Sequence, residues 1–170
     1  RTIDVYSEGR YHAGPVTFVA GAIYTNGMRR QDQSFPAATI GKAGFNQLSP
    51  RFGVIWEPRS GLEFYANYSR SHELPGSIEL AQVASFVPLE AQHAWTAEIG
   101  ARGKLGQARF DISLYRANVR NELLQFSVGP DIPASTFNAD RTLHQGIEAG
   151  LDLDLAHWAT VRQVYQFNDF

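Results

Sequence analysis

Two aspartates separated by one residue are the pair in this chain best suited to hold a cation. Asp152 and Asp154 stand in the stretch HQGIEAGLDLDLAH (144–157), and residues at i and i+2 of a strand point to the same side. Carboxylate oxygens suit hard divalent cations, but such a cage needs about six to eight oxygens. No further acidic residue follows closely. We therefore predict no metal site and interpret both carboxylates as part of the water-facing side of a strand.

The same stretch alternates strictly between polar and apolar residues. His144, Glu148, Asp152 and Asp154 share one side, and aliphatic residues share the other: Ile147, Ala149, Leu151, Leu153 and Leu155. Alternation of this kind is typical of a strand with one wet face and one apolar face. It recurs near 3–12, 52–57, 62–69, 95–102, 109–114 and 158–170, and less cleanly near 16–25. We count eight strands and predict an all-β chain.

Composition narrows the class of protein. The 170 residues carry a formal charge of −2 and no cysteine. Without a basic stripe we exclude a nucleic-acid partner, and without cysteine we exclude disulfides and thiolate metal sites. Apolar runs such as 16–24 are shorter than the roughly 18 residues of a spanning helix. Because the sequence opens and closes in what look like strands, we expect it to be part of a longer chain.

Short and long connections alternate between the expected strands. Gly/Pro turns lie at 13–15, 58–61 and 103–106, with a two-residue link at 156–157, whereas long polar connections span 26–50, 72–89 and 119–137. Outer-membrane barrels have short periplasmic turns and long extracellular loops, and about ten residues of a tilted strand cross the bilayer. We therefore predict an antiparallel up-and-down meander, about eight strands of a larger transmembrane β-barrel.

Large aromatic residues are expected near both ends of these strands. Tyr11, Trp56 and Trp158 adjoin short turns, while Tyr24, Tyr68 and Trp95 lie nearer the long connections. Such rings favour the lipid headgroup layer, although they could equally fill the core of a sandwich. We interpret them as two aromatic girdles. The aliphatic side of 144–157 then faces lipid, and its polar side, described above, faces the wet interior.

Three segments carry a resemblance to a known family: LSPRFGVIWEPRSGLEFYANYSRSHELP (48–75), EAQHAWTAEIGARGKLGQARFDISLYRANVRNELLQF (90–126) and FNADRTLHQGIEAGLDLDL (137–155). They are similar to successive barrel segments of the TonB-dependent siderophore receptors of the bacterial outer membrane. The resemblance implies a barrel of about 22 strands with a plug domain. Residues 1–170 would be part of the barrel wall, with the plug absent from them.

The resemblance also implies a function. Such receptors bind a ferric siderophore, or cobalamin or another scarce nutrient, at the extracellular mouth and import it when TonB pulls on the plug. The expected partners are thus a ferric siderophore as cargo, outer-membrane lipid, and TonB through the plug, with no resident cofactor. No TonB-contacting segment is recognised among these residues.

Candidate ligand-binding residues lie where strands enter the long connections. Arg29, Arg30 and Gln31 stand in the first connection, and Arg70 and His72 at the start of the second. Guanidinium groups suit an anionic chelate because they donate paired hydrogen bonds to oxyanions. The alternative is that these side chains pair with lipid headgroups or with neighbouring loops.

Catalytic motifs are not found in the sequence. It has no Gly-x-Ser-x-Gly elbow and no His-Glu-x-x-His helix, and its five histidines are scattered. We predict no enzyme and no catalytic residue, with a serine beside His72 or His144 as the remaining catalytic alternative. Two other functions stay open, a passive porin-like channel and a soluble β-sandwich binding module.

Overall fold

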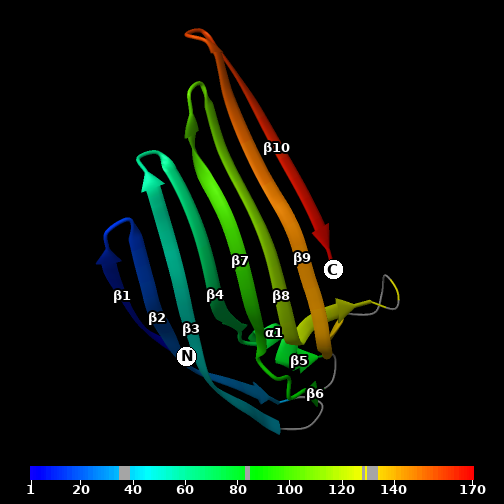
Figure 1. The fold of residues 1–170 in the computed structure, drawn as a ribbon. Coiled ribbons are helices and arrows are strands. Elements are labelled where there is room, and N and C mark those ends of the chain that lie inside the picture. Colours follow the sequence, from blue (N-terminus) through cyan, green and yellow to red (C-terminus); the bar gives the residue numbers. More distant parts are fainter. Residues whose placement is uncertain (35–38, 83–84, 128, 130–133) are drawn as a thin grey trace.

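Eight long strands form one antiparallel sheet in which every strand pairs with its neighbours in chain order (Figure 1). The computed structural model describes residues 1–34, 39–82, 85–127, 129 and 134–170. The strands are β1 (Thr2–Ala13), β2 (Val16–Gln33), β3 (Thr39–Arg59), β4 (Leu62–Glu73), β7 (Gln92–Leu105), β8 (Ala108–Phe126), β9 (Ser135–Ala156) and β10 (Ala159–Asp169). The prediction of an all-β meander of eight strands is confirmed.

The tight turns lie together at one end of the sheet, at the top of Figure 1. Three of them contain a glycine with positive φ: Gly14 at 58°, Gly61 at 79° and Gly106 at 62°. This left-handed region costs glycine little but strains residues that carry a Cβ. These glycines therefore let the strands reverse within two residues, and they fix the register of their hairpins.

The long connections are shorter than the sequence suggests. We expected loops over 26–50 and 119–137, but β2 continues to Gln33, β3 begins at Thr39, β8 continues to Phe126 and β9 begins at Ser135. The ladder persists there, for example between Arg30 and Lys42. Polar side chains do not end a strand while its backbone groups remain paired. The strands consequently reach 22 residues, beyond the roughly ten needed to cross a bilayer.

The second long connection folds back onto the sheet. It contains α1 (Ser77–Leu80), β5 (Ala81–Gln82) and β6 (Ser85–Phe86), which lie at the end of the sheet opposite the tight turns (Figure 1). Leu80 is 1% exposed, and Leu74 packs so closely on β2 that a Cβ at Gly27 would lie 2.5 Å from it. Buried apolar side chains gather at this end of the molecule. No helix in the described residues is long and apolar enough to cross a membrane.

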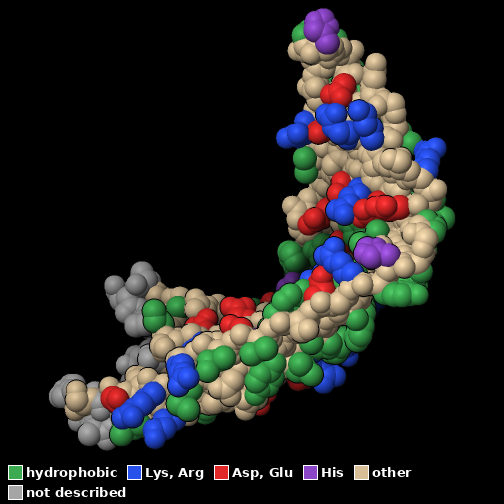
Figure 2. All heavy atoms as spheres, turned by 90° about the vertical axis from the view of Figure 1, so that its left-hand side faces the viewer, with side chains coloured by type: hydrophobic (Ala, Val, Ile, Leu, Met, Phe, Trp, Pro, Cys, Tyr) green, Lys and Arg blue, Asp and Glu red, His purple; other side chains and the backbone are tan. Residues whose placement is uncertain are grey.

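The two faces of the sheet differ in chemistry. One row of paired residues crosses all eight strands and is entirely apolar: Tyr11, Phe18, Val54, Ala66, Ile99, Leu114, Ile147 and Phe167. The adjacent row on the other face is mostly polar: Arg10, Val19, Gly53, Asn67, Glu98, Tyr115, Gly146 and Asn168. The sheet bends around a hollow, with hydrophobic side chains on the outside of the bend (Figure 2). We call these the convex apolar face and the concave polar face.

Candidate functional site

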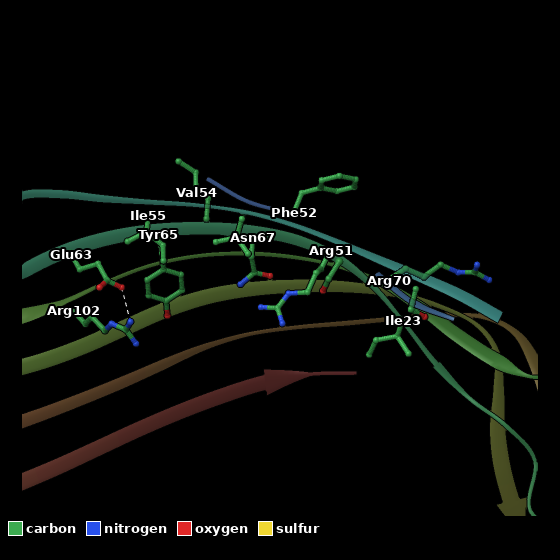
Figure 3. Close-up of a pocket in the computed structure, with 15 residues that line it drawn as sticks. Ile23, Arg51, Phe52, Val54, Ile55, Glu63, Tyr65, Asn67, Arg70 and Arg102 are labelled. Carbon is green, nitrogen blue, oxygen red and sulfur yellow. Dashed lines mark ion pairs between the residues drawn. The ribbon is translucent and has the colours of Figure 1, made fainter. Parts of the chain in front are cut away.

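Polar side chains on the concave face bond to one another across neighbouring strands. Tyr65 and Asn67 of β4 donate hydrogen bonds to Glu98 of β7 at 3.3 and 2.8 Å. Arg102 of β7 pairs with Glu63 of β4 at 2.7 Å (Figure 3). Because each bond joins two strands, this network fixes the positions of these side chains on the concave face.

A cavity of about 410 Å³ lies against β2, β3, β4 and β7. Figure 3 shows Arg51, Tyr65 and Asn67 on one side of the sheet and Phe52 on the other, so the polar lining belongs to the concave face. Three arginines line the cavity (Arg51, Arg70 and Arg102) against one carboxylate, Glu63. The lining is therefore net positive and suits an anion.

The aspartates singled out in the sequence pair with arginines. Arg162 approaches Asp152 at 2.7 Å, and Arg109 approaches Asp154 at 2.7 Å and Asp152 at 3.8 Å. Arg109 and Arg162 come from the strands on either side of β9. No group of three or more His, Cys, Asp or Glu side chains in the described part of the chain is placed to hold a metal ion. The guanidinium groups thus occupy the positions that a cation would take.

The other two residues of that polar side also lie on the concave face. Glu148 accepts a hydrogen bond from Gln166 at 3.1 Å. His144 lies 3.2 Å from the carboxylate of Glu122, which also accepts a hydrogen bond from Thr142. Both residues join neighbouring strands, as the paired aspartates do.

The structure gives the first group of ligand candidates three different surroundings. Arg29 donates to the carbonyl of Pro75 and to Thr2, each at 3.1 Å, and so holds the second connection against β2. Arg30 is exposed and pairs with Asp32 at 3.0 Å. Gln31 is half-buried, and its Oε1 has no hydrogen-bond partner among the described residues. The three are neighbours in sequence but do not form one site.

Arg70 and His72 stand where β3 and β4 separate. The two strands stop pairing after Arg51 and Ser69, and Arg70 reaches across to the carbonyl of Leu48 at 2.9 Å and to Gln47 at 3.2 Å. Arg70 also borders the cavity, and its ladder partner on β7 is Trp95 of the convex face, so it lies at the edge where β4 leaves β3. The sequence did not indicate this opening, because the alternation of β4 continues through it and only the loss of pairing reveals it.

The structure brings His72 next to a serine. Its Nδ1 lies 2.6 Å from Oγ of Ser49, which is only 6% exposed. Burial lowers the pKa of His72; the Asp4 carboxylate opposes this shift, and Arg70 adds to it. Asp4 itself accepts a hydrogen bond from Thr25. A buried hydroxyl beside a neutral imidazole is a packing arrangement that bridges β3 and β4.

The expected girdle residues form two groups along the strands, one beside the tight turns and one about midway along β2 and β4. Tyr11, Trp56 and Trp158 adjoin the tight turns, and Trp158 is 78% exposed. Farther from the turns Tyr68 and Trp95 stack on the convex face with ring centroids 4.8 Å apart, and Tyr24 lies on the same face. The rings thus border the apolar rows of the convex face.

Comparison with known proteins adds an independent line of support. The family model described as "TonB dependent receptor-like, beta-barrel" matches residues 1–169. No curated protein matches the chain. Solved structures similar to it include the FrpB iron transporter of Neisseria meningitidis (19% identity, TM-score 0.72, 98% of this chain and 25% of that one). The siderophore receptor PiuA of Acinetobacter baumannii is also similar (17% identity, TM-score 0.77, 99% and 25%), as is the copper transporter OprC (13%, 0.81, 98% and 28%).

The present chain spans about a quarter of the length of these structures. At such identities the structures show the fold, and the family model supplies the assignment. The resemblance noted in the sequence is therefore confirmed. The chain belongs to the TonB-dependent receptor β-barrel family, whose members are transporters of the bacterial outer membrane and not enzymes.

Proposed function

We propose that this chain is part of the barrel wall of a receptor that imports a ferric siderophore by TonB-coupled transport. The observation that carries the choice of cargo is the net positive concave cavity. Ferric siderophores are often anionic, and guanidinium groups form strong, directed hydrogen bonds with oxyanions. The family assignment supports the coupling to TonB, which would act through a plug domain elsewhere in the intact protein.

Arg70 is the side chain best placed to bind the anion. Arg51 and Arg102, which share the cavity, are paired with Glu8 at 3.4 Å and Glu63 at 2.7 Å. Arg70 instead bonds to a carbonyl and to a neutral amide, so no carboxylate of the described residues neutralises its charge. An anion in the cavity would supply the missing opposite charge.

The other residues predicted from the sequence would contribute less, or only indirectly, to ligand binding. Gln31 would extend the binding surface at the mouth, Arg29 would hold the second connection in place, and His72 would bridge β3 and β4 beside Arg70. Arg30, which lies on the convex face and pairs with Asp32, would not contact the ligand. His144, Glu148, Asp152 and Asp154 would face the wet lumen.

Relatives with this fold differ in cargo. Their names describe an iron transporter, a siderophore receptor and a copper transporter. An anionic chelate is favoured for this protein because the cavity offers cationic hydrogen-bond donors, whereas a bare metal ion requires lone-pair donors.

Uptake of radioactive ferric siderophores by cells that express the intact protein tests this proposal. Uptake is expected to require TonB, and Arg70→Gln is expected to weaken binding of the transported chelate about tenfold or more, the loss of one charged hydrogen-bonding group. Arg59→Gln, close to a tight turn at the opposite end, is the matched control and should bind normally. Uptake that persists without TonB would instead indicate a passive channel. Normal binding by Arg70→Gln would exclude the cavity as the site.

A further inference from the structure

A cluster of arginines lies on the convex face, just beyond the apolar rows and at the end of the long connections. On β8 the convex residues change from Ile112 and Leu114 to Arg116, Asn118 and Arg120. Arg141 of β9 lies directly opposite Arg120 in the ladder. This face points away from the concave cavity, so the proposed import function makes no use of these arginines.

The arginines of this cluster have few partners. Arg116 and Arg120 are exposed and form no hydrogen bond or ion pair with any described residue, and Arg141 donates only to Asn118, at 3.3 Å. Directly opposed like charges on neighbouring strands destabilise a sheet unless something lies between them. An anion between the two guanidinium groups would remove this repulsion.

The nearby carboxylates of the described residues form no ion pair with these arginines. Asp169 of β10 lies opposite Gln145, which in turn lies opposite Arg116. It accepts a hydrogen bond from Gln145 at 3.1 Å. Glu90, which acts electrostatically on His93, accepts a hydrogen bond from Asn121 at 2.5 Å. Each acid is held by a neutral amide and forms no ion pair with an arginine of the cluster.

The arginines border a cavity of about 340 Å³ that also contains aromatic rings. It is lined by Tyr68, His93, Trp95, Asn118, Arg120 and Arg141, and we call it the rim pocket. Tyr68 and Trp95 are the stacked pair described above, and they separate the pocket from the apolar row that contains Ile99 and Leu114. The pocket thus has a cationic side and an aromatic side that continues into the apolar face.

A ligand that complements both the cationic and the aromatic side of the rim pocket needs an anionic head and an apolar tail. The head would accept hydrogen bonds from Arg120 and Arg141, and the tail would lie along Ile99, Leu114 and Ile147. Arginine binds phosphate through two parallel hydrogen bonds, and aromatic rings favour the headgroup layer. We propose that the rim pocket binds the phosphate-bearing headgroup of an outer-leaflet lipid.

Native mass spectrometry of the intact protein in detergent tests this site, with dimyristoyl phosphatidic acid, dimyristoyl phosphatidylcholine and inorganic phosphate as probes. The wild type is expected to retain phosphatidic acid at least tenfold better than phosphatidylcholine. Arg120→Ala together with Arg141→Ala should abolish that preference. The matched control is Arg30→Ala, an exposed convex arginine at the same end of the sheet that is already paired with Asp32.

Four outcomes would overturn the proposal. Equal retention of the two lipids would show that the pocket does not recognise an anionic phosphate headgroup. Displacement of phosphatidic acid by millimolar inorganic phosphate would identify a site for the free ion. An unchanged preference in the double variant, or an equal loss in Arg30→Ala, would place lipid binding elsewhere. Heat-modifiable migration on gels identifies folded barrels, so that a folding defect is not read as lost binding.

Discussion

At the scale of single residues, close packing on the concave face depends on glycines opposite large rings. A Cβ at Gly100 would lie 2.3 Å from the ring of Tyr65, and one at Gly146 would lie 2.7 Å from the ring of Tyr115. Both rings also donate hydrogen bonds, to Glu98 and to Asn168. The glycines therefore allow aromatic side chains to lie flat on the sheet and still reach polar partners on the next strands.

Gly146→Ala is expected to destabilise the barrel by about 1–3 kcal/mol, the usual cost of overpacking. The new Cβ would lie 2.4 Å from the carbonyl oxygen of Phe167, a backbone atom that cannot move without disturbing β10. The free energy of unfolding in urea, followed by tryptophan fluorescence, measures the effect. Gly44→Ala is the control because nothing lies within 4 Å of its Cβ. Equal effects in both variants would contradict this explanation.

The half-buried bond between His72 and Ser49 makes stability depend on pH. His72 lies beyond the aromatic rim, outside the membrane, and burial lowers its pKa below the ordinary value of about 6.5. The folded state thus binds a proton less readily than the unfolded state, so its stabilisation is complete above about pH 6.5 and declines as the pH falls below that value. The melting temperature of the wild type should therefore drop more between pH 7.5 and pH 5 than that of His72→Gln. His157→Gln, changed in an exposed turn, should behave like the wild type, and identical pH profiles for all three proteins would refute the prediction.

At the scale of elements, alternation predicted the strands and their two faces, but pairing determined where they end. The side of β9 that carries Asp152 and Asp154 is concave, as its polar residues indicated, and the tight turns lie at the glycines. The extra length of β2, β3, β8 and β9 was missed because polar extensions above the membrane resemble loops when only hydropathy is considered. Arg70 illustrates the same limit, because its environment arises from an interruption of pairing between β3 and β4 that no local pattern encodes.

Ile112→Lys is expected to cost about 2–4 kcal/mol of folding free energy in a bilayer, because the charge would lie at mid-depth on the lipid-facing side. Val164→Lys on β10 is the control, since Val164 is 78% exposed and lies on the concave face. It should cost less than about 1 kcal/mol. Equilibrium unfolding from phosphatidylcholine vesicles gives both values. A similar cost for the two substitutions would argue against the assignment of the faces.

At the scale of the whole molecule, the sheet is open on both sides. Within the described residues β1 pairs only with β2, and β10 pairs only with β9. Unpaired backbone groups are costly in lipid, where no water replaces the missing partners. The family assignment was within reach of the sequence because it rests on residue order and turn spacing. The grouping of the cavity residues was not, because the cavity joins side chains from β2, β3, β4 and β7 that lie far apart in the chain.

Produced alone, the 170-residue chain should not persist as a monomer with free edges. We expect it to close on itself or to pair with a second copy, because either arrangement satisfies the edge strands. Sedimentation velocity in detergent, combined with hydrogen exchange of the amides in β1 and β10, distinguishes these states. A stable monomer whose edge amides exchange freely would disprove the expectation, and the intact protein provides the reference for protected edges.

The meander has a consequence for how such walls change in evolution. Within the described residues, every long strand of the large sheet pairs only with the long strands that precede and follow it in the chain, and each hairpin carries its own tight turn. The entropic cost of closing each pair is local and rises only slowly with the length of the connection. Gain or loss of one hairpin by duplication or deletion would therefore leave the registers of the remaining strands intact. The circumference of the wall can change in steps of two strands, while the long connections diverge independently to suit new cargo.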